Sequence, residues 1–228
     1  MSTPSKRYRA AAVKITTAKQ YTVEEAVAIV KEAPTKFDAS VELHARLGID
    51  PKKSEQSIRG SVQLPHGTGR TKRVIAFVGA NHEADAKAAG ADIIGTAEVI
   101  QQIKTTGKID FDVAVATPDM MKQLAPVARI LGQKGLMPNP KTETVGPDVK
   151  KMVTALKQGK VNFKNDVTGN IHLAIGKVSF PADHIVANAQ AVIEAIRKAK
   201  PATAKGTYIR SLTLATTMGP GVPLSANA

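Results

Sequence analysis

The first part of the chain changes from a helical period of hydrophobic positions to an alternating one. Residues 22–25 form a capping-box pattern, Thr-Val-Glu-Glu, in which the threonine hydroxyl accepts a helix amide and the last glutamate reaches back to the threonine N–H. The apolar positions that follow predict a helix that ends before Pro34. Residues 41–49 alternate apolar and polar side chains, which indicates a half-buried strand, and residues 58–64 predict a second, antiparallel strand.

A turn-rich junction at residues 65–70 is followed by a different pattern. Residues 74–78 are continuously apolar, as expected for a strand in a sheet that helices cover on both faces. Strands and helices then alternate, which predicts a small parallel sheet of Rossmann-like topology. The expected strands are 74–78, 92–94 and 111–116, and the expected helices are 83–89, 96–104, a stretch around 120–131, and 147–156.

Strand patterns return after Gly159, and a long amphipathic helix follows them. The last strand is expected at residues 210–216, with a tight turn and a frayed tail after it. The expected elements are strands at 161–163 and around 171–175, and the helix between Pro181 and Pro201.

An α+β pattern thus flanks an α/β pattern, and a chain of 228 residues can form two small cores. We expect a discontinuous α+β domain I, residues 1–67 plus 160–228, with a Rossmann-like, three-layer α/β domain II, residues 68–159, inserted into it. The two crossings between the domains would act as a hinge.

The charge indicates a polyanionic partner. Lys and Arg number 32 against 19 Asp and Glu, a net charge of +13, and cations that neutralise phosphates release counterions. The outer segments hold 19 basic and 10 acidic side chains, whereas residues 68–159 hold 13 and 9. We therefore expect the main RNA site in domain I. Five Phe, three Tyr and no Trp are too few for a base-stacking platform, which favours recognition of folded RNA through its backbone, sugars and shape.

Other function classes find little support. There is no cysteine, no apolar run near the roughly 18 residues that span a bilayer, and no secretory signal at the N-terminus, so we expect a cytoplasmic protein with no membrane partner. The five histidines form no metal-ligand spacing, and no catalytic constellation is present, so we expect neither metal nor cofactor. Residues 79–81 follow a strand but lack a phosphate-loop spacing. A nucleotide-dependent enzyme and a non-specific basic coat for nucleic acid remain the alternatives.

Two segments stand out as candidate binding loops. Residues 124–140 run from a short helix into a Gly-Gln-Lys-Gly turn and a proline-rigid loop, and an ordinary basic loop is the alternative. Residues 216–221, Thr-Thr-Met-Gly-Pro-Gly, combine hydroxyls with glycines that allow close backbone approach to a ligand, and a simple tight turn is the alternative.

These two segments, in this order and spacing, closely resemble the ribosomal protein L-one family of bacterial type. Residues 36–42, 159–166 and 209–213 match as well, so the similarity covers essentially the whole chain. The resemblance implies a two-domain fold with the RNA site in domain I. It places the RNA-binding residues at Lys36, Phe37, Ser40, Glu42, Asp166, Thr168, Ser211, Thr213, Thr217, Met218 and Gly219.

The resemblance also implies partners and roles. They are the stalk region of large-subunit ribosomal RNA, deacylated tRNA leaving the exit site, and the mRNA of the protein's own operon, which it would repress. The protein would be part of the large ribosomal subunit and a monomer when free.

The residue types suit these roles. Lys36 can neutralise a phosphate, and the Ser and Thr hydroxyls can bond the 2′-OH groups that distinguish RNA from DNA. Glu42 would either accept a hydrogen bond from RNA or orient Lys36. Phe37 and Met218 would pack on ribose or an exposed base, with core packing as the alternative.

Overall fold

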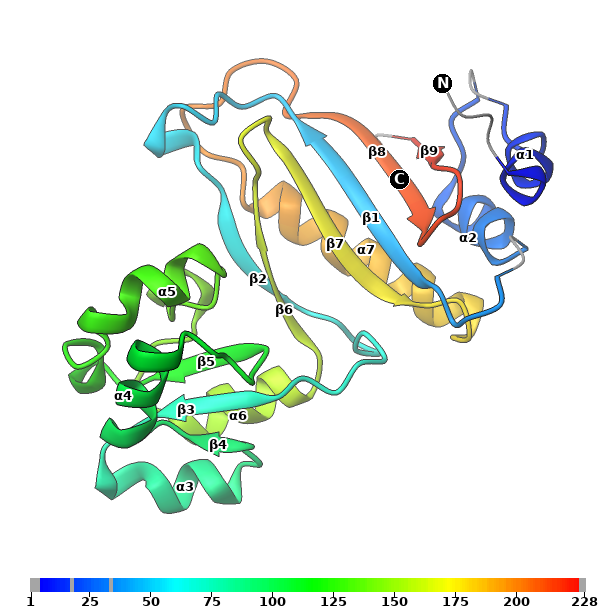
Figure 1. Ribbon diagram of the computed structural model, residues 1–228. Coiled ribbons are helices and arrows are strands. Elements are labelled where there is room, and N and C mark those ends of the chain that lie inside the picture. The colour runs from blue at the N-terminus through cyan, green and yellow to red at the C-terminus, as the bar shows by residue number, and fades with distance from the viewer. Residues whose placement is uncertain (1–4, 17–18, 33–34, 226–228) are drawn as a thin grey trace. The chain divides into compact units, whose positions relative to one another are not determined.

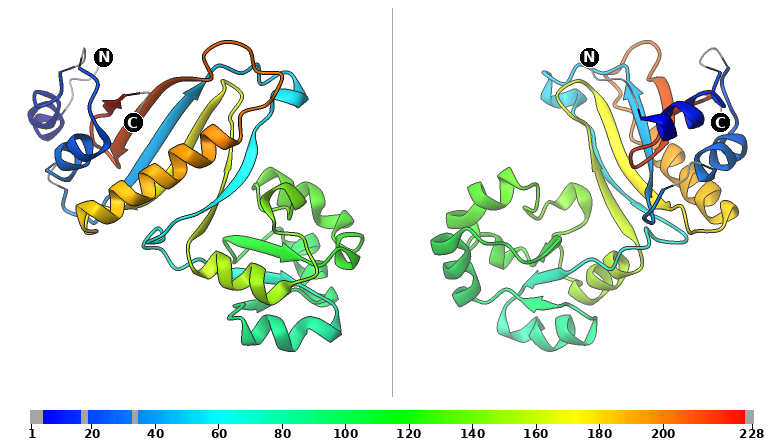
Figure 2. Two further views of the ribbon diagram at one scale, coloured as in Figure 1. Left: turned by 180° about the vertical axis from the view of Figure 1, so that it is seen from behind. Right: turned by 45° about the vertical axis from the view of Figure 1, so that its right-hand side comes forward.

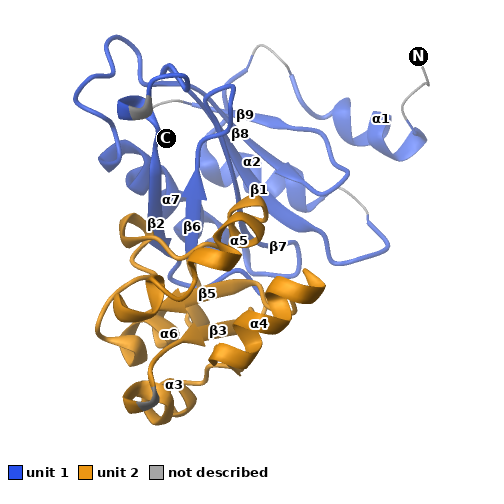
Figure 3. Cartoon of the chain, turned by 60° about the vertical axis from the view of Figure 1, so that its left-hand side comes forward, with its two compact units in different colours: residues 1–69, 161–228 blue, residues 70–160 orange. Residues whose placement is uncertain are grey.

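The computed structural model of the protein describes residues 5–16, 19–32 and 35–225, and the fold is mixed α/β (Figure 1). The chain divides into two compact units, unit 1 of residues 1–69 and 161–228 and unit 2 of residues 70–160 (Figure 3). Whether these units are the independent domains expected from the sequence stays a prediction.

Unit 1 is built on a four-stranded sheet in the order β7-β1-β8-β9, in which each described pair is antiparallel. Helix α7 crosses one face of this sheet, as Figure 2 shows from behind, and α2 packs against α7, β8 and β9. The strands are β1 (Ser40–Leu47), β7 (Asn170–Lys177), β8 (Ile209–Thr216) and β9 (Val222–Leu224), and the helices are α1 (Lys6–Ala12), α2 (Val23–Lys31) and α7 (Ala182–Lys198).

The helices of unit 1 follow from local sequence signals. Thr22 caps α2, and the full capping box is present, with Glu25 N–H donating to the Thr22 hydroxyl and Thr22 N–H donating to the Glu25 carboxylate. The apolar stripe of α7 is buried against the sheet together with Asn188. The Asn188 amide donates to the carbonyls of Gly67 and Ile175, so it ties the end of the first segment to α7.

Two expectations for unit 1 need correction. Strand β2 (Arg59–Gln63) exists, but it pairs with β6 (Lys160–Lys164) in a separate two-stranded sheet and not with β1, because β7 and β8 occupy both edges of β1. Strand β8 is not the last strand, because β9 follows it in the segment expected to fray. The sequence pattern also gave no indication of α1.

Unit 2 is a three-stranded parallel sheet in the order β4-β3-β5. Alternate residues of β3 enter two separate cores, Ile75 and Phe77 on one face and Val74 and Ala76 on the other. Helices α4 and α5 complete the first core, and α3 and α6 complete the second. The elements are β3 (Val74–Phe77), β4 (Ile93–Ile94), β5 (Val113–Ala116), α3 (Glu83–Ala88), α4 (Ala97–Thr106), α5 (Ala128–Gln133) and α6 (Val149–Lys157).

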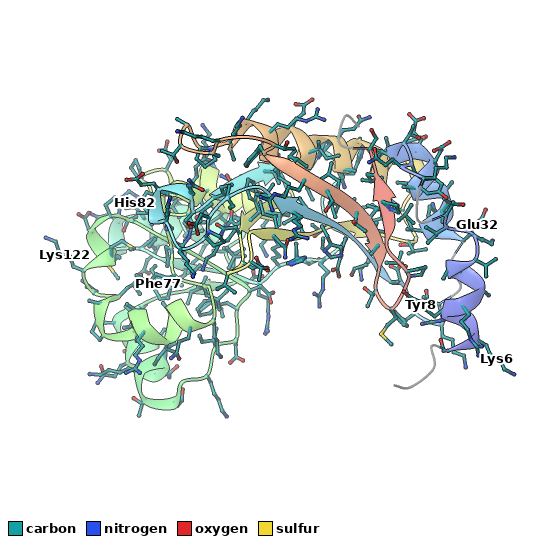
Figure 4. The ribbon with its side chains drawn as sticks, turned by 90° about the horizontal axis from the view of Figure 1, so that it is seen from above. Lys6, Tyr8, Glu32, Phe77, His82 and Lys122 are labelled. Carbon is teal, nitrogen blue, oxygen red and sulfur yellow. The ribbon has the colours of Figure 1, made fainter. Side chains whose placement is uncertain are left out.

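Short 3-10 helices occupy several connections. The stretch expected to be helical around residues 120–131 is broken into two 3-10 turns and α5, because Pro126 lacks the N–H that a continuous helix needs. The 3-10 helices are Ser54–Gln56, Ala80–His82, Asp119–Met121, Ala125–Val127 and Pro140–Thr142. In Figure 4 the Phe77 side chain lies inside unit 2, whereas Lys122 points outward from it.

Candidate nucleic-acid interface

One face of the β7-β1-β8 sheet is polar and accessible. Along β1, buried Val41, Leu43, Ala45 and Leu47 face the helices, and the residues between them are half-buried or exposed. The antiparallel register places side chains of the three strands in rows on this face, which we call the open face. The rows are Ala174-Glu42-Ala215, His172-His44-Thr213 and Asn170-Arg46-Ser211.

A shallow groove lies over the second and third rows of the open face. Its lining offers two imidazoles, a guanidinium, an amide and three hydroxyls, which are the groups that bond phosphates and 2′-OH groups. The groove is lined by His44, Ala45, Arg46, Thr168, Asn170, His172, Ser211 and Thr213.

One end of the open face is organised by Ser40 and Thr217. The Thr217 hydroxyl accepts a hydrogen bond from Ser40 N–H at 3.2 Å, and Thr217 N–H donates to the Ser40 carbonyl at 3.0 Å. Lys177 donates to the Ser40 hydroxyl at 3.1 Å, which brings a cation into the same corner. The structure therefore joins two predicted site residues that lie 177 positions apart in the chain.

The turn after β8 carries the other predicted residues of this corner. Gly219 N–H donates to the Thr216 carbonyl at 2.8 Å, and Met218 between them has a φ of 66°, the left-handed region that favours glycine. The Met218 side chain is 70% exposed, so the core-packing alternative is wrong for this residue. A Cβ on Gly219 would lie 2.2 Å from the Thr216 Oγ1, so the turn requires a glycine there.

The loop between β6 and β7 holds Asp166 and Thr168 at the opposite end of the face. Asp166 accepts hydrogen bonds from the N–H groups of Asn170 at 2.7 Å and Thr168 at 2.8 Å, and from the Thr168 hydroxyl at 2.7 Å. These hydrogen bonds hold the pKa of the Asp166 carboxyl far below its usual range, and the bond from Asn170 N–H has the largest effect. Asp166 therefore organises the loop and orients Thr168.

Lys36 and Phe37 lie on the segment that leads into β1, and both are exposed. Phe37 is 49% exposed, so the core-packing alternative is wrong here as well. Glu42 makes no ion pair with Lys36 among the described residues; the basic group near its carboxylate is His44, with its Nε2 3.9 Å away.

The structure thus brings five predicted residues together on or at the edge of the open face: Ser40, Glu42, Ser211, Thr213 and Thr217. Asp166 and Thr168 stand at one end of the face, while Lys36, Phe37, Met218 and Gly219 lie on the segments that adjoin the Ser40 end. Further residues share the face although the sequence did not single them out, and the alternation in β1 already places His44 and Arg46 on the same side as Glu42. The missed residues are His44, Arg46, Asn170, His172 and Lys177.

The fold brings His44 and His172 together and places each near a carboxylate. Sequence spacing showed no grouping of histidines with carboxylates, yet His172 Nε2 lies 3.8 Å from Asp166 and the two imidazoles contact each other. Among the described residues, no group of three His, Cys, Asp or Glu side chains could hold a metal ion. No helix in the described ranges is long and apolar enough to cross a membrane.

Comparison with known proteins gives a consistent result. Residues 29–220 match the model of the ribosomal protein L1p/L10e family. The chain is 54% identical to the large ribosomal subunit protein uL1 of Deinococcus radiodurans over 222 residues, which cover 96% of the chain and 95% of that protein. It is 52% identical to the protein of the same name from Salinispora tropica over 98% of the chain and 94% of that protein. The counterpart from Thermobifida fusca is 50% identical over 98% of the chain and 95% of that protein.

Proposed function

We propose, from the premise that the chain belongs to the ribosomal protein L1p/L10e family, that it binds the stalk region of large-subunit ribosomal RNA through the open face of unit 1. It is a structural protein of the large ribosomal subunit on cytoplasmic ribosomes, and not an enzyme. The observation that carries the RNA proposal is the gathering of hydroxyl, cationic and imidazole groups from three strands on one accessible face.

The chemistry of the face favours folded RNA over a single strand. Serine and threonine hydroxyls lie along the rows of the face, where they can bond 2′-OH groups and phosphates. Aromatic rings are few, and among the large exposed hydrophobic side chains of the described residues only Phe37 and Met218 belong to the proposed contacts. These two side chains would pack on ribose or on an exposed base at the Ser40 end.

The two ends of the face take different parts in this proposal. At the Ser40 end, Thr217, Met218 and Gly219 would present a preformed turn to the RNA, because the left-handed φ of Met218 exists before any partner binds. At the other end, Asp166 would act by holding Thr168, since its oxygens already accept hydrogen bonds from the loop.

We also propose the domain organisation expected from the sequence. Unit 1 would be domain I with the main RNA site, and unit 2 would be a Rossmann-like domain II inserted into it. The parallel strand order β4-β3-β5 and helices on both faces of the sheet support this assignment for unit 2. Family membership supports two further roles, binding of exit-site tRNA and repression of the protein's own mRNA. For the repression, the mRNA would contain a fold similar to the stalk region and would bind the same open face.

Substitution of Met218 or Thr217 by alanine tests the RNA site. We expect Met218→Ala and Thr217→Ala each to weaken binding of a stalk-region transcript by about 1 kcal/mol or more, roughly fivefold, because each removes a contact at the Ser40 end. Electrophoretic or calorimetric titration at one salt concentration measures this, and circular dichroism checks that the variants fold.

Thr105→Ala is the matched control, because the Thr105 hydroxyl is an exposed group of α4 in unit 2 and, within the described ranges, donates to the Gln101 carbonyl of its own helix. Unchanged affinity in both site variants would reject the assignment. Competition with bulk tRNA separates the proposal from a non-specific coat, since a coat shows little preference between the two RNAs.

A further inference from the structure

The centre of the open face holds two histidines, His44 and His172, which the sequence did not single out as RNA contacts. His44 of β1 and His172 of β7 are directly opposed in the antiparallel register, and their Nδ1 atoms lie 2.8 Å apart. The rings meet edge to face with centroids 5.0 Å apart. A distance of 2.8 Å between two ring nitrogens indicates a hydrogen bond, in which one Nδ1 carries the proton and donates and the other Nδ1 accepts the bond.

The outer nitrogens of both rings face carboxylates. His44 Nε2 lies 3.9 Å from Glu42, and His172 Nε2 lies 3.8 Å from Asp166. An ionised carboxylate only accepts hydrogen bonds, so each Nε2 is best placed when it carries a proton. The row therefore has three positions for protons, two at the Nε2 atoms and one shared between the Nδ1 atoms.

The number of protons on the four ring nitrogens of His44 and His172 determines the charge of the pair in this geometry. Two neutral imidazoles bring two protons and leave one of the three positions empty. One further proton fills all three and gives the pair a single positive charge. A second further proton would set two N–H donors against each other across the 2.8 Å contact. The arrangement thus admits one added proton and excludes two.

The groups around the pair come from four elements. Strand β1 contributes Glu42 and Arg46, the β6–β7 loop contributes Asp166, β8 contributes the hydroxyl of Thr213, and Lys177 lies farther along β7 at the Ser40 end. Burial and then His172 lower the pKa of His44, while Glu42 raises it. An arriving phosphate adds negative charge beside the imidazoles and favours their charged form.

We propose that His44 and His172, flanked by Glu42 and Asp166, belong to the RNA site as a proton-sharing pair that takes up one proton when the RNA backbone enters the groove. The inference rests on the proposed function, because it names further residues of the same site. Bound RNA favours the protonated form of the pair, so affinity for RNA increases as pH falls through the range in which the pair takes up its proton, and affinity is independent of pH above that range.

The test is the pH profile of RNA binding by the full chain. Affinity for the stalk-region transcript is measured at constant ionic strength from about pH 8 to about pH 5.5, where imidazole titrates. We expect the wild type to bind more tightly as pH falls, with a limiting slope of about tenfold per pH unit for one proton. His44→Gln and His172→Gln keep a polar side chain that does not titrate there, and each should flatten the profile and weaken binding at the acidic end.

His82→Gln in unit 2 is the matched control and should leave the profile unchanged, because His82 is half-exposed on a 3-10 helix of the other unit. A wild-type profile that is flat, or one that keeps its slope in both site variants, would overturn the pair. Should a variant fail to fold, NMR titration of the wild-type imidazoles with and without RNA decides, since an unmoved midpoint for both rings contradicts the proposal. A wild type that ignores stalk RNA at every pH would instead refute the proposed function.

Discussion

At the scale of single residues, the proposed site depends on positions whose backbone or surroundings are unusual. Met218 takes a left-handed conformation that non-glycine residues rarely adopt, and its apolar side chain remains exposed. Gly219 beside it is needed for steric reasons, because Thr216 fills the space that a side chain would take. Such strain persists only where the surrounding structure enforces it, and here the hydrogen bonds between Thr217 and Ser40 do so.

Gly219→Ala should destabilise the protein by about 1–3 kcal/mol, because the new methyl group overlaps the side chain of buried Thr216. Urea unfolding followed by circular dichroism measures this loss. Gly132→Ala is the control, since a Cβ at Gly132 in α5 meets nothing within 4 Å and alanine favours a helix, so that variant should be neutral or stabilised by up to about 1 kcal/mol. Equal stability of the two variants would contradict the steric argument.

At the scale of elements, short local signals decide how each segment begins. The capping box of α2 satisfies two backbone donors, whereas Thr96, at the same position before α4, makes no side-chain cap hydrogen bond. In the β6–β7 loop a single carboxylate, Asp166, accepts hydrogen bonds from both Thr168 and Asn170 and so fixes both residues. A threonine before a helix therefore contributes to the free energy of unfolding only when its side chain makes the capping hydrogen bond.

Thr22→Ala should lower the free energy of unfolding by about 1 kcal/mol, because the Glu25 N–H loses its capping acceptor. Thr96→Ala should cost clearly less, since no cap hydrogen bond is lost. The shift of the thermal or urea midpoint measures both effects. Similar losses in the two variants would show that the capping hydrogen bond contributes little.

At the scale of the whole molecule, the hydrophobic cores belong to separate parts of the chain. The buried residues of the large core of unit 1 lie between Tyr21 and Leu64 and between Phe163 and Leu224. The two cores of unit 2 use buried residues between Val74 and Leu156 alone. Each unit therefore encloses its own apolar side chains, which is the physical condition for independent folding.

A fragment of residues 70–160 should accordingly fold by itself, with a cooperative thermal transition measured by circular dichroism, because both of its cores are self-contained. The same fragment should not bind the stalk-region transcript, since the open face lies in unit 1. Stalk binding by the fragment with the affinity of the full chain would contradict the assignment of the main site. A fragment without a cooperative transition would contradict the proposed domain organisation.

Much of the fold was predictable because its signals are local in the chain. The alternation around β1, the continuous apolar run of β3 and the capping box of α2 each arise within a few residues, and the structure confirms all three elements. Alternation also determines which side chains of β1 share a face, so Glu42, His44 and Arg46 could be grouped from sequence. Strand β9 was missed because three residues with a central proline are too short to show a period.

Only the tertiary structure decided which strands are neighbours. The partner of β2 and the contact between His44 and His172, 128 positions apart, depend on long-range register, which no local period encodes. The same holds for the corner where Thr217 meets Ser40. The sequence by itself determined the residue types, most of the helices and the buried face of β1. The assembly of several strands into one surface required the packed chain, because strand pairing joins residues that are distant in sequence.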